Sequence, residues 1–178
     1  MRCLTALSLA EGATTPAQED GEAQRPTAPD AIATVLTWTQ AIELLDTMPG
    51  VDQRGAEVLV ADIGLDMTRF GSAQRLAAWA GVAPGNDESA GVRRSGRTRK
   101  GNRSLRTALV QLAHGAVRTK DTYLSALYHR LAARRGKKRA IMAVAHSMLV
   151  SAFHMLTRHE SYRELGANYF DQDRKSVV

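Results

Sequence analysis

Residues 44–64 read LLDTMPGVDQRGAEVLVADIG, and this stretch predicts two helices joined by a tight turn. Apolar residues lead up to Pro49-Gly50-Val51 and recur after it at helical spacing as far as Ile63. Pro49 cannot continue the first helix, and Gly50 permits a tight turn. Gly64 stands where the second helix is expected to end.

This pattern resembles the helix-hairpin-helix motif of DNA-binding proteins. In that motif, amide groups of the hairpin hold a phosphate at the start of the second helix. A second glycine usually follows the hydrophobic residue, but Asp52 stands at that position here, and its carboxylate would repel a phosphate. Two roles therefore stay open for Pro49, Gly50 and Val51: contact with DNA, or a purely structural turn.

The remaining sequence also favours helices, so the predicted fold class is an all-α, compact helical domain. Aromatic residues make up only 5% of the chain, which favours helices packed through Leu, Ala, Val and Met. Apolar spacing predicts a helix from about residue 31, a short helix over 73–80, and longer helices over about 105–118, 122–135 and 138–157.

Residues suited to helix ends flank these segments: Ser72, Asn102 or Ser104, Asp121 and Gly136. On the short helix, Trp79 is expected in the core together with Leu76, Ala77 and Ala80. A tryptophan there is also able to stack on a base, although packing is the more common role.

The chain is expected to hold one domain with two tails. Residues 1–30 contain three of the five prolines and lack apolar periodicity in 11–30, so we expect a disordered tail. The helical domain is expected over 31–172, with a frayed end over 173–178. Cys3 is the single cysteine, which fits a reducing cytoplasm. No membrane partner is expected, because no apolar run approaches about 20 residues.

Charge is divided unevenly along the chain. Residues 31–88 carry 3 Lys and Arg against 8 Asp and Glu, whereas residues 89–178 carry 19 against 5. A half-chain this basic predicts a polyanionic partner, and nucleic acid is the usual one. A basic surface that is merely solvated is the alternative.

The basic half begins with residues 81–106, which read GVAPGNDESAGVRRSGRTRKGNRSLR and predict an irregular loop or a short hairpin. Arg103 and Arg106 oppose the dipole of the helix that follows unless an anion is bound there. The residues expected to bind nucleic acid lie in this run and near the start of the last helix: Arg93, Arg94, Arg97, Arg99, Lys100, Asn102, Arg103, Arg106, Arg135, Lys137 and Lys138.

Ser89, near the start of the basic run, is the candidate nucleophile. A serine needs a base to attack a phosphate, and Asp87 or Glu88 is close enough in sequence to supply one. The following arginines are suited to stabilise charge on a phosphoryl group. A loop serine beside small residues is more often a plain turn residue, and that reading stays open.

The histidines predict no metal site. No two of them stand at i, i+4, and no cysteine lies near them. His146 and His154 lie two turns apart on one predicted helix and are interpreted as interfacial or satisfied core groups.

Four blocks of sequence carry a resemblance over about residues 40–172: MPGVDQRGAEVLVADIG, RFGSAQRLAAWAGVAPGNDESAG, RRSGRTRKGN and YHRLAARRGKKRAIMAVAHSML. Together they resemble the C-terminal domain of the DEDD-type insertion-sequence transposases, also called bridge-RNA-guided recombinases. The resemblance implies cutting and rejoining of DNA through a serine that forms a covalent link to DNA. Ser89 matches that serine, and Ser95 is the weaker match. It also implies a structured guide RNA and assembly as an oligomer on DNA.

Full-length members of that family also carry an N-terminal RuvC-like domain that binds magnesium. Residues 1–30 hold no segment resembling it, so we expect no cofactor in this chain, and Mg²⁺ only together with such a domain. The chain alone is then expected to be inactive, as a truncated remnant of a transposase. The alternative is a non-catalytic helix-hairpin-helix protein that binds nucleic acid and co-assembles with, or regulates, a full-length transposase.

Overall fold

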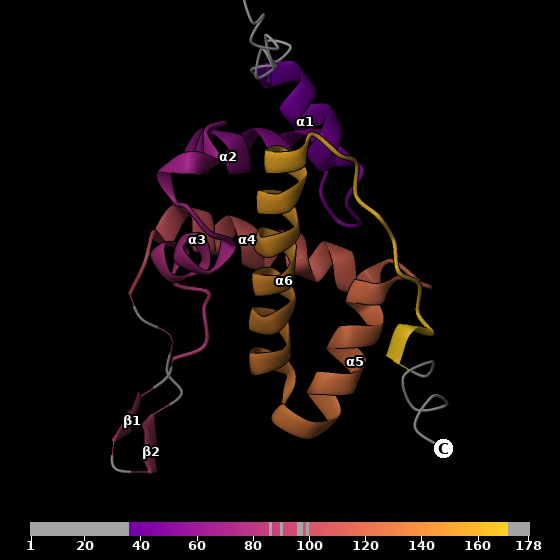
Figure 1. The fold of residues 1–178 in the computed structure, drawn as a ribbon. Helices are drawn as coiled ribbons and strands as arrows, with labels where there is room; N and C mark the ends of the chain where they lie inside the picture. Colours follow the sequence, from indigo (N-terminus) through magenta and orange to yellow (C-terminus); the bar gives the residue numbers. More distant parts are fainter. Residues whose placement is uncertain (1–35, 86, 90, 96–97, 99, 171–178) are drawn as a thin grey trace, which may run out of the picture. The chain divides into compact units, whose positions relative to one another are not determined.

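The computed structural model describes residues 36–170, apart from residues 86, 90, 96–97 and 99. The two predicted tails and the start of the first predicted helix lie outside these residues. Within them the chain forms six α-helices and one two-stranded hairpin (Figure 1). The predicted all-α fold class is confirmed.

The helices and strands follow one another with short connections. In chain order they are α1 (Trp38–Asp46), α2 (Gln53–Ile63), the 3-10 turn η1 (Met67–Arg69), α3 (Ala73–Ala80), β1 (Asp87–Ser89), β2 (Val92–Ser95), α4 (Arg103–Arg118), α5 (Tyr123–Arg135) and α6 (Lys137–Arg158).

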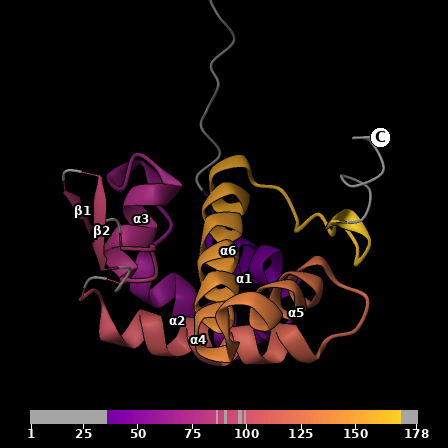
Figure 2. The ribbon, with the colours of Figure 1, turned by 90° about the horizontal axis from the view of Figure 1, so that it is seen from below.

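Helix α6 is the centre of the packing. It contacts α1, α3, α4 and α5, and Figures 1 and 2 both show α4 crossing it. Ten of its residues are buried: Ala140, Ile141, Val144, Ala145, Met148, Leu149, Ala152, Phe153, Met155 and Leu156. By length and composition α6 could cross a membrane, but 56% of that apolar stretch is buried inside the protein. Because its apolar residues face other helices, α6 is the core helix of this domain.

The turn between α1 and α2 packs closely on α4. Gly50 has a φ of 80°, and a Cβ built on it would overlap the backbone of Ala116. From the other side, a Cβ on Gly115 would lie 3.1 Å from the Gly50 carbonyl oxygen. The predicted tight turn is therefore present, and its glycine also allows two backbones to approach each other.

Several predicted helix ends are confirmed, and one is wrong. Ser72 and Asn102 cap α3 and α4 with their side chains, and Gly136 ends α5. The predicted cap Asp121 instead has a left-handed φ of 59°, and the Thr122 side chain caps α5. Glu164, 41 residues further along, also accepts a hydrogen bond from the Tyr123 backbone N–H at 2.7 Å. The start of α5 thus depends partly on a residue remote in sequence.

Trp79 was expected in the core, and this prediction is wrong. Leu76, Ala77 and Ala80 of α3 are buried, but the Trp79 side chain is 42% exposed. Its ring lies against Phe70, with 5.4 Å between the ring centroids. Helical spacing placed Trp79 beside the buried residues, but the neighbouring helices cover only the other side of α3.

Candidate nucleic-acid interface

The Gly-rich basic run forms a short hairpin rather than an irregular loop. Strands β1 and β2 pair antiparallel, with Ser89 opposite Val92, Glu88 opposite Arg93, and a register irregularity between Asp87 and Glu88. Ser89 is the last residue of β1 and stands beside the turn that contains Gly91, whose φ is 75°. The candidate nucleophile is therefore at the tip of the hairpin.

The other predicted residues before α4 divide into three groups, of which one is Lys100, an exposed residue just before the helix. Arg93 and Arg94 lie in β2, and Ser95, the weaker serine candidate, lies in β2 opposite Asp87, away from the tip. Arg97 and Arg99 fall outside the described residues. The backbone thus places Ser89 and two of the predicted cations in one hairpin.

The two residues that precede α4 are held against the end of α3. The Asn102 backbone N–H donates to the Trp79 carbonyl oxygen at 3.1 Å. A Cβ on Gly101 would overlap the backbone of Gly81, so only glycine fits this approach. The start of α4 is consequently held beside the end of α3.

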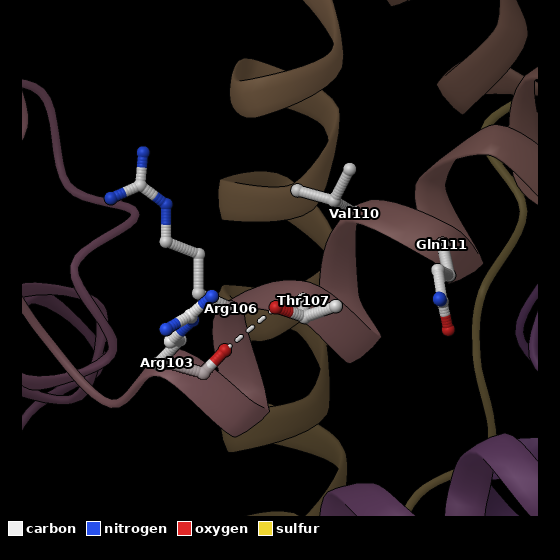
Figure 3. Close-up of a pocket in the computed structure, with 5 residues that line it drawn as sticks. All are labelled: Arg103, Arg106, Thr107, Val110 and Gln111. Atoms are coloured by element: carbon white, nitrogen blue, oxygen red, sulfur yellow. Dashed lines mark hydrogen bonds between the residues drawn. The ribbon is translucent and has the colours of Figure 1, made fainter.

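The start of α4 carries positive charge and a surface depression (Figure 3). Asn102 caps the helix by accepting from the Leu105 N–H at 3.3 Å, and the first turn contains Arg103 and no acidic residue. A depression of about 370 Å³ runs along one face of α4, and five residues line it: Arg103, Arg106, Thr107, Val110 and Gln111. Two guanidinium groups beside a helix N-terminus favour a phosphate there.

A second basic surface lies where α5 ends and α6 begins. Arg135, Lys137 and Lys138 are exposed there, and Arg134 and Arg139 are exposed beside them. Among the described residues, side chains cap the starts of α1 to α5, but none caps α6. The α6 start therefore offers backbone N–H donors together with a high density of cations, a combination that suits an anion.

The start of α2 carries a carboxylate, unlike the basic starts of α4 and α6. The Asp52 side chain accepts a hydrogen bond from the Gly55 N–H at 2.8 Å and caps the helix. A carboxylate thus occupies the end of the helix at which the helix-hairpin-helix motif holds a phosphate. Pro49 and Gly50 are only partly exposed and Val51 is buried.

The acidic and histidine side chains of the described residues do not gather into a metal site. Nowhere in that part of the chain do three His, Cys, Asp or Glu side chains come together in a way that could hold a metal ion. Asp66 is engaged by the Thr68 hydroxyl and backbone N–H, which lower the pKa of its carboxyl.

The two histidines of α6 have different surroundings, and for His146 the interpretation as a satisfied core group is wrong. His154 is exposed. Nδ1 of His146 is buried and has no hydrogen-bond partner within the described part of the chain. Burial lowers the pKa of His146, which favours the neutral imidazole.

Sequence reasoning missed Thr107 and Gln111 as members of these surfaces. Thr107 and Gln111 were recognisable, because they stand four and eight residues after Arg103 and so share its helix face. The guanidinium carbon of Arg130 lies 4.6 Å from the centroid of the Phe170 ring. That contact links α5 to the C-terminal segment, which no local pattern predicts.

The sequence of this region is similar to that of a known protein family. Residues 42–129 match the family described as Transposase IS116/IS110/IS902 family. Over these residues the chain is similar to insertion-sequence transposases. The matched residues include the α1–α2 turn, the hairpin with Ser89, and all of α4.

One known transposase is similar to this chain over a longer stretch. The transposase for insertion sequence element IS1111A of Coxiella burnetii is 32% identical over 142 residues, which cover 75% of this chain and 38% of the relative. The chain thus spans well under half of that transposase.

Proposed function

We propose that this domain binds the DNA of an insertion sequence through the basic starts of α4 and α6 and the β1–β2 hairpin. The observation that carries the proposal is the charge distribution: residues 89–159 contain 16 Lys and Arg and one carboxylate, Asp121. Cations of this kind contact phosphates and position a protein on nucleic acid. A transposase domain needs such a surface to hold DNA ends.

Within this proposal Ser89 is the nucleophile. Its Oγ forms a bond to a backbone phosphorus while one phosphorus–oxygen bond to deoxyribose breaks, and the released sugar oxygen takes up a proton. The serine proton passes to a base, for which Asp87 and Glu88 are the neighbouring candidates in β1. Arginines of the same hairpin stabilise the charge that develops on the phosphoryl oxygens. The position of Ser89 at the hairpin tip supports this role over Ser95.

The α1–α2 turn has a structural role in this proposal. Asp52 caps α2, and Gly50 packs on Ala116, so the turn fixes α2 on α4. Phosphates are instead assigned to the Arg103 and Arg106 depression and to the cations around Gly136. The remaining parts of the proposal are a structured guide RNA, assembly with itself or with a full-length transposase, and action in the cytoplasm.

Binding is tested by measuring affinity for a fluorescent DNA duplex at several salt concentrations. Each phosphate contact that releases counterions steepens the dependence of log affinity on log salt by about 0.9. For four contacts we expect the affinity to fall about 100-fold between 50 and 200 mM salt. An affinity that hardly changes over this range would contradict the proposed interface.

The serine chemistry needs a separate experiment. A nicked suicide substrate is incubated with the chain in the presence of a full-length transposase of the same family, and protein–DNA adducts of this chain's size are counted after denaturation. We expect an adduct that Ser89→Ala abolishes and Ser95→Ala leaves intact. Binding without any adduct would favour the second candidate function, a non-catalytic protein that co-assembles with or regulates a transposase.

A further inference from the structure

An exposed aromatic pair lies beside the proposed DNA surface and has no role in it so far. Trp79 is 42% exposed on α3, and Phe70 packs against its ring at 5.4 Å between centroids with an interplanar angle of 53°. Phe70 belongs to the core edge, so it fixes one side of the indole while the rest stays open to solvent. A large apolar ring held in this way is suited to contact a flat partner.

The backbone holds this pair next to the α4 start. The Trp79 carbonyl accepts from the Asn102 N–H, and Asn102 is the cap residue that precedes Arg103. The close approach of Gly101 to Gly81 keeps the start of α4 beside the end of α3. A strand whose phosphates sit at the α4 start would therefore pass near the end of α3.

The charge around the pair also favours a nucleic acid over an apolar protein surface. Residues 67–86 contain Arg69 and Arg75 and no carboxylate. Arg75 lies four residues before Trp79, so both occupy the same exposed face of α3. An aromatic ring flanked by cations is how proteins hold the unpaired bases of single strands, by stacking each base while cations follow the backbone.

We infer that Trp79 is a stacking site for an unpaired base of the DNA strand bound at the α4 start. The inference rests on the proposed function, because it takes the strand as already bound there. Opened DNA is the expected ligand, since a base inside a duplex has no free face for stacking.

Fluorescence tests this contact directly, because the chain has only two tryptophans. In Trp38→Phe, Trp79 is the sole emitter, and Trp79→Phe is the matched control that retains only Trp38. Each variant is titrated with single-stranded DNA, with the same strand carrying abasic sites, with a duplex, and with single-stranded RNA, while anisotropy of a labelled strand reports binding.

We expect single-stranded DNA to quench Trp79 emission along the binding curve, and the abasic strand to bind without quenching. We expect no quench in Trp79→Phe, and in Trp79→Ala an affinity for the single strand lower by about tenfold. Binding that leaves Trp79 emission unchanged overturns this inference and leaves the proposed function standing. Equal quenching by the duplex, or quenching by RNA at lower concentrations than by DNA, also overturns it. If no strand binds at all, the proposed function fails and the inference fails with it.

Discussion

Two short connections between helices, at α1–α2 and at α5–α6, have opposite surroundings. Both contain a glycine with positive φ, Gly50 at 80° and Gly136 at 83°. A Cβ on Gly50 would overlap the backbone of α4, whereas no atom lies within 4 Å of a Cβ built on Gly136. The helix after the first connection is capped by a carboxylate, and the helix after the second starts with exposed cations.

This difference shows that a connection can resemble a DNA-binding motif in sequence without being suited to bind a phosphate. The α1–α2 turn has the sequence pattern of a DNA-binding motif, but its glycine is explained by packing and its helix end is occupied by Asp52. The α5–α6 connection matches no such motif, yet it offers exposed N–H groups and positive charge. Access and charge therefore favour the second connection as a phosphate contact.

The largest effect is expected from Gly50→Ala. The new methyl group would overlap the Ala116 backbone and hold a strained φ, so the free energy of unfolding should fall by on the order of 3–5 kcal/mol. The matched variant Gly136→Ala has the strain without the overlap and should be destabilised by about 1–3 kcal/mol. Urea unfolding followed by circular dichroism measures both. Equal destabilisation of the two variants would contradict the packing role of the α1–α2 turn.

The next effect is expected at the α4 depression. Removing two phosphate contacts with Arg103→Gln and Arg106→Gln should lower affinity for DNA by about tenfold or more and reduce the salt slope by about 1.8. Arg118→Gln removes an exposed cation at the opposite end of the same helix and is the control. If Arg118→Gln weakens binding as much as Arg103→Gln and Arg106→Gln do, the net charge of the protein and not the depression determines the affinity for DNA, which contradicts this prediction.

A smaller effect on stability is expected at Asp52. Asp52→Ala removes the α2 cap and should lower the free energy of unfolding by about 1 kcal/mol, whereas Asp52→Asn keeps a capping side chain and should be nearly neutral. Neither variant should change affinity for DNA by more than about twofold, a range typical of residues outside the interface. A marked gain of affinity in Asp52→Asn would show that a phosphate approaches the α1–α2 turn after all.

The smallest effect concerns acid stability. Burial lowers the pKa of His146 in the folded chain, so below about pH 6.5 the unfolded chain binds more protons at this residue than the folded chain does. This contribution to stability is complete above that pH and disappears as the pH falls. His146→Gln should make unfolding free energy less dependent on pH between 5 and 7. An unchanged slope would mean that His146 is not the group responsible.

The fold could be predicted from sequence wherever local chemistry determines it. Ser72, Asn102 and Gly136 form hydrogen bonds within the helix turn next to them, so the local sequence was enough to predict these helix ends. The prediction that Asp121 caps α5 was wrong, because the Thr122 side chain caps this helix and the distant Glu164 accepts a hydrogen bond from its first residue. The exposure of Trp79 depends on which neighbours cover α3, which spacing along one helix does not reveal.

The candidate site could be predicted in composition but not in arrangement. Charge counting identified the basic half, and the cations Arg103, Lys137 and Lys138 are indeed exposed. Sequence left the segment around Ser89 open between loop and hairpin, because its glycines and arginines show no alternation. Helical spacing places Arg103, Thr107 and Gln111 on one face, but the depression beside them depends on tertiary packing, which spacing does not reveal. Whether Ser89 attacks DNA stays a prediction.

The central claim is that phosphates bind at the α6 start and not at the α1–α2 turn. It is tested most directly by the salt dependence of DNA affinity in Lys137→Gln/Lys138→Gln/Arg139→Gln, compared with Arg54→Gln, which removes an exposed cation beside Asp52. The account predicts that the triple variant reduces the slope of log affinity against log salt by about 0.9 for each phosphate that the variant no longer binds, while Arg54→Gln leaves the slope unchanged. An unchanged slope in the triple variant together with a reduced slope in Arg54→Gln would contradict the account.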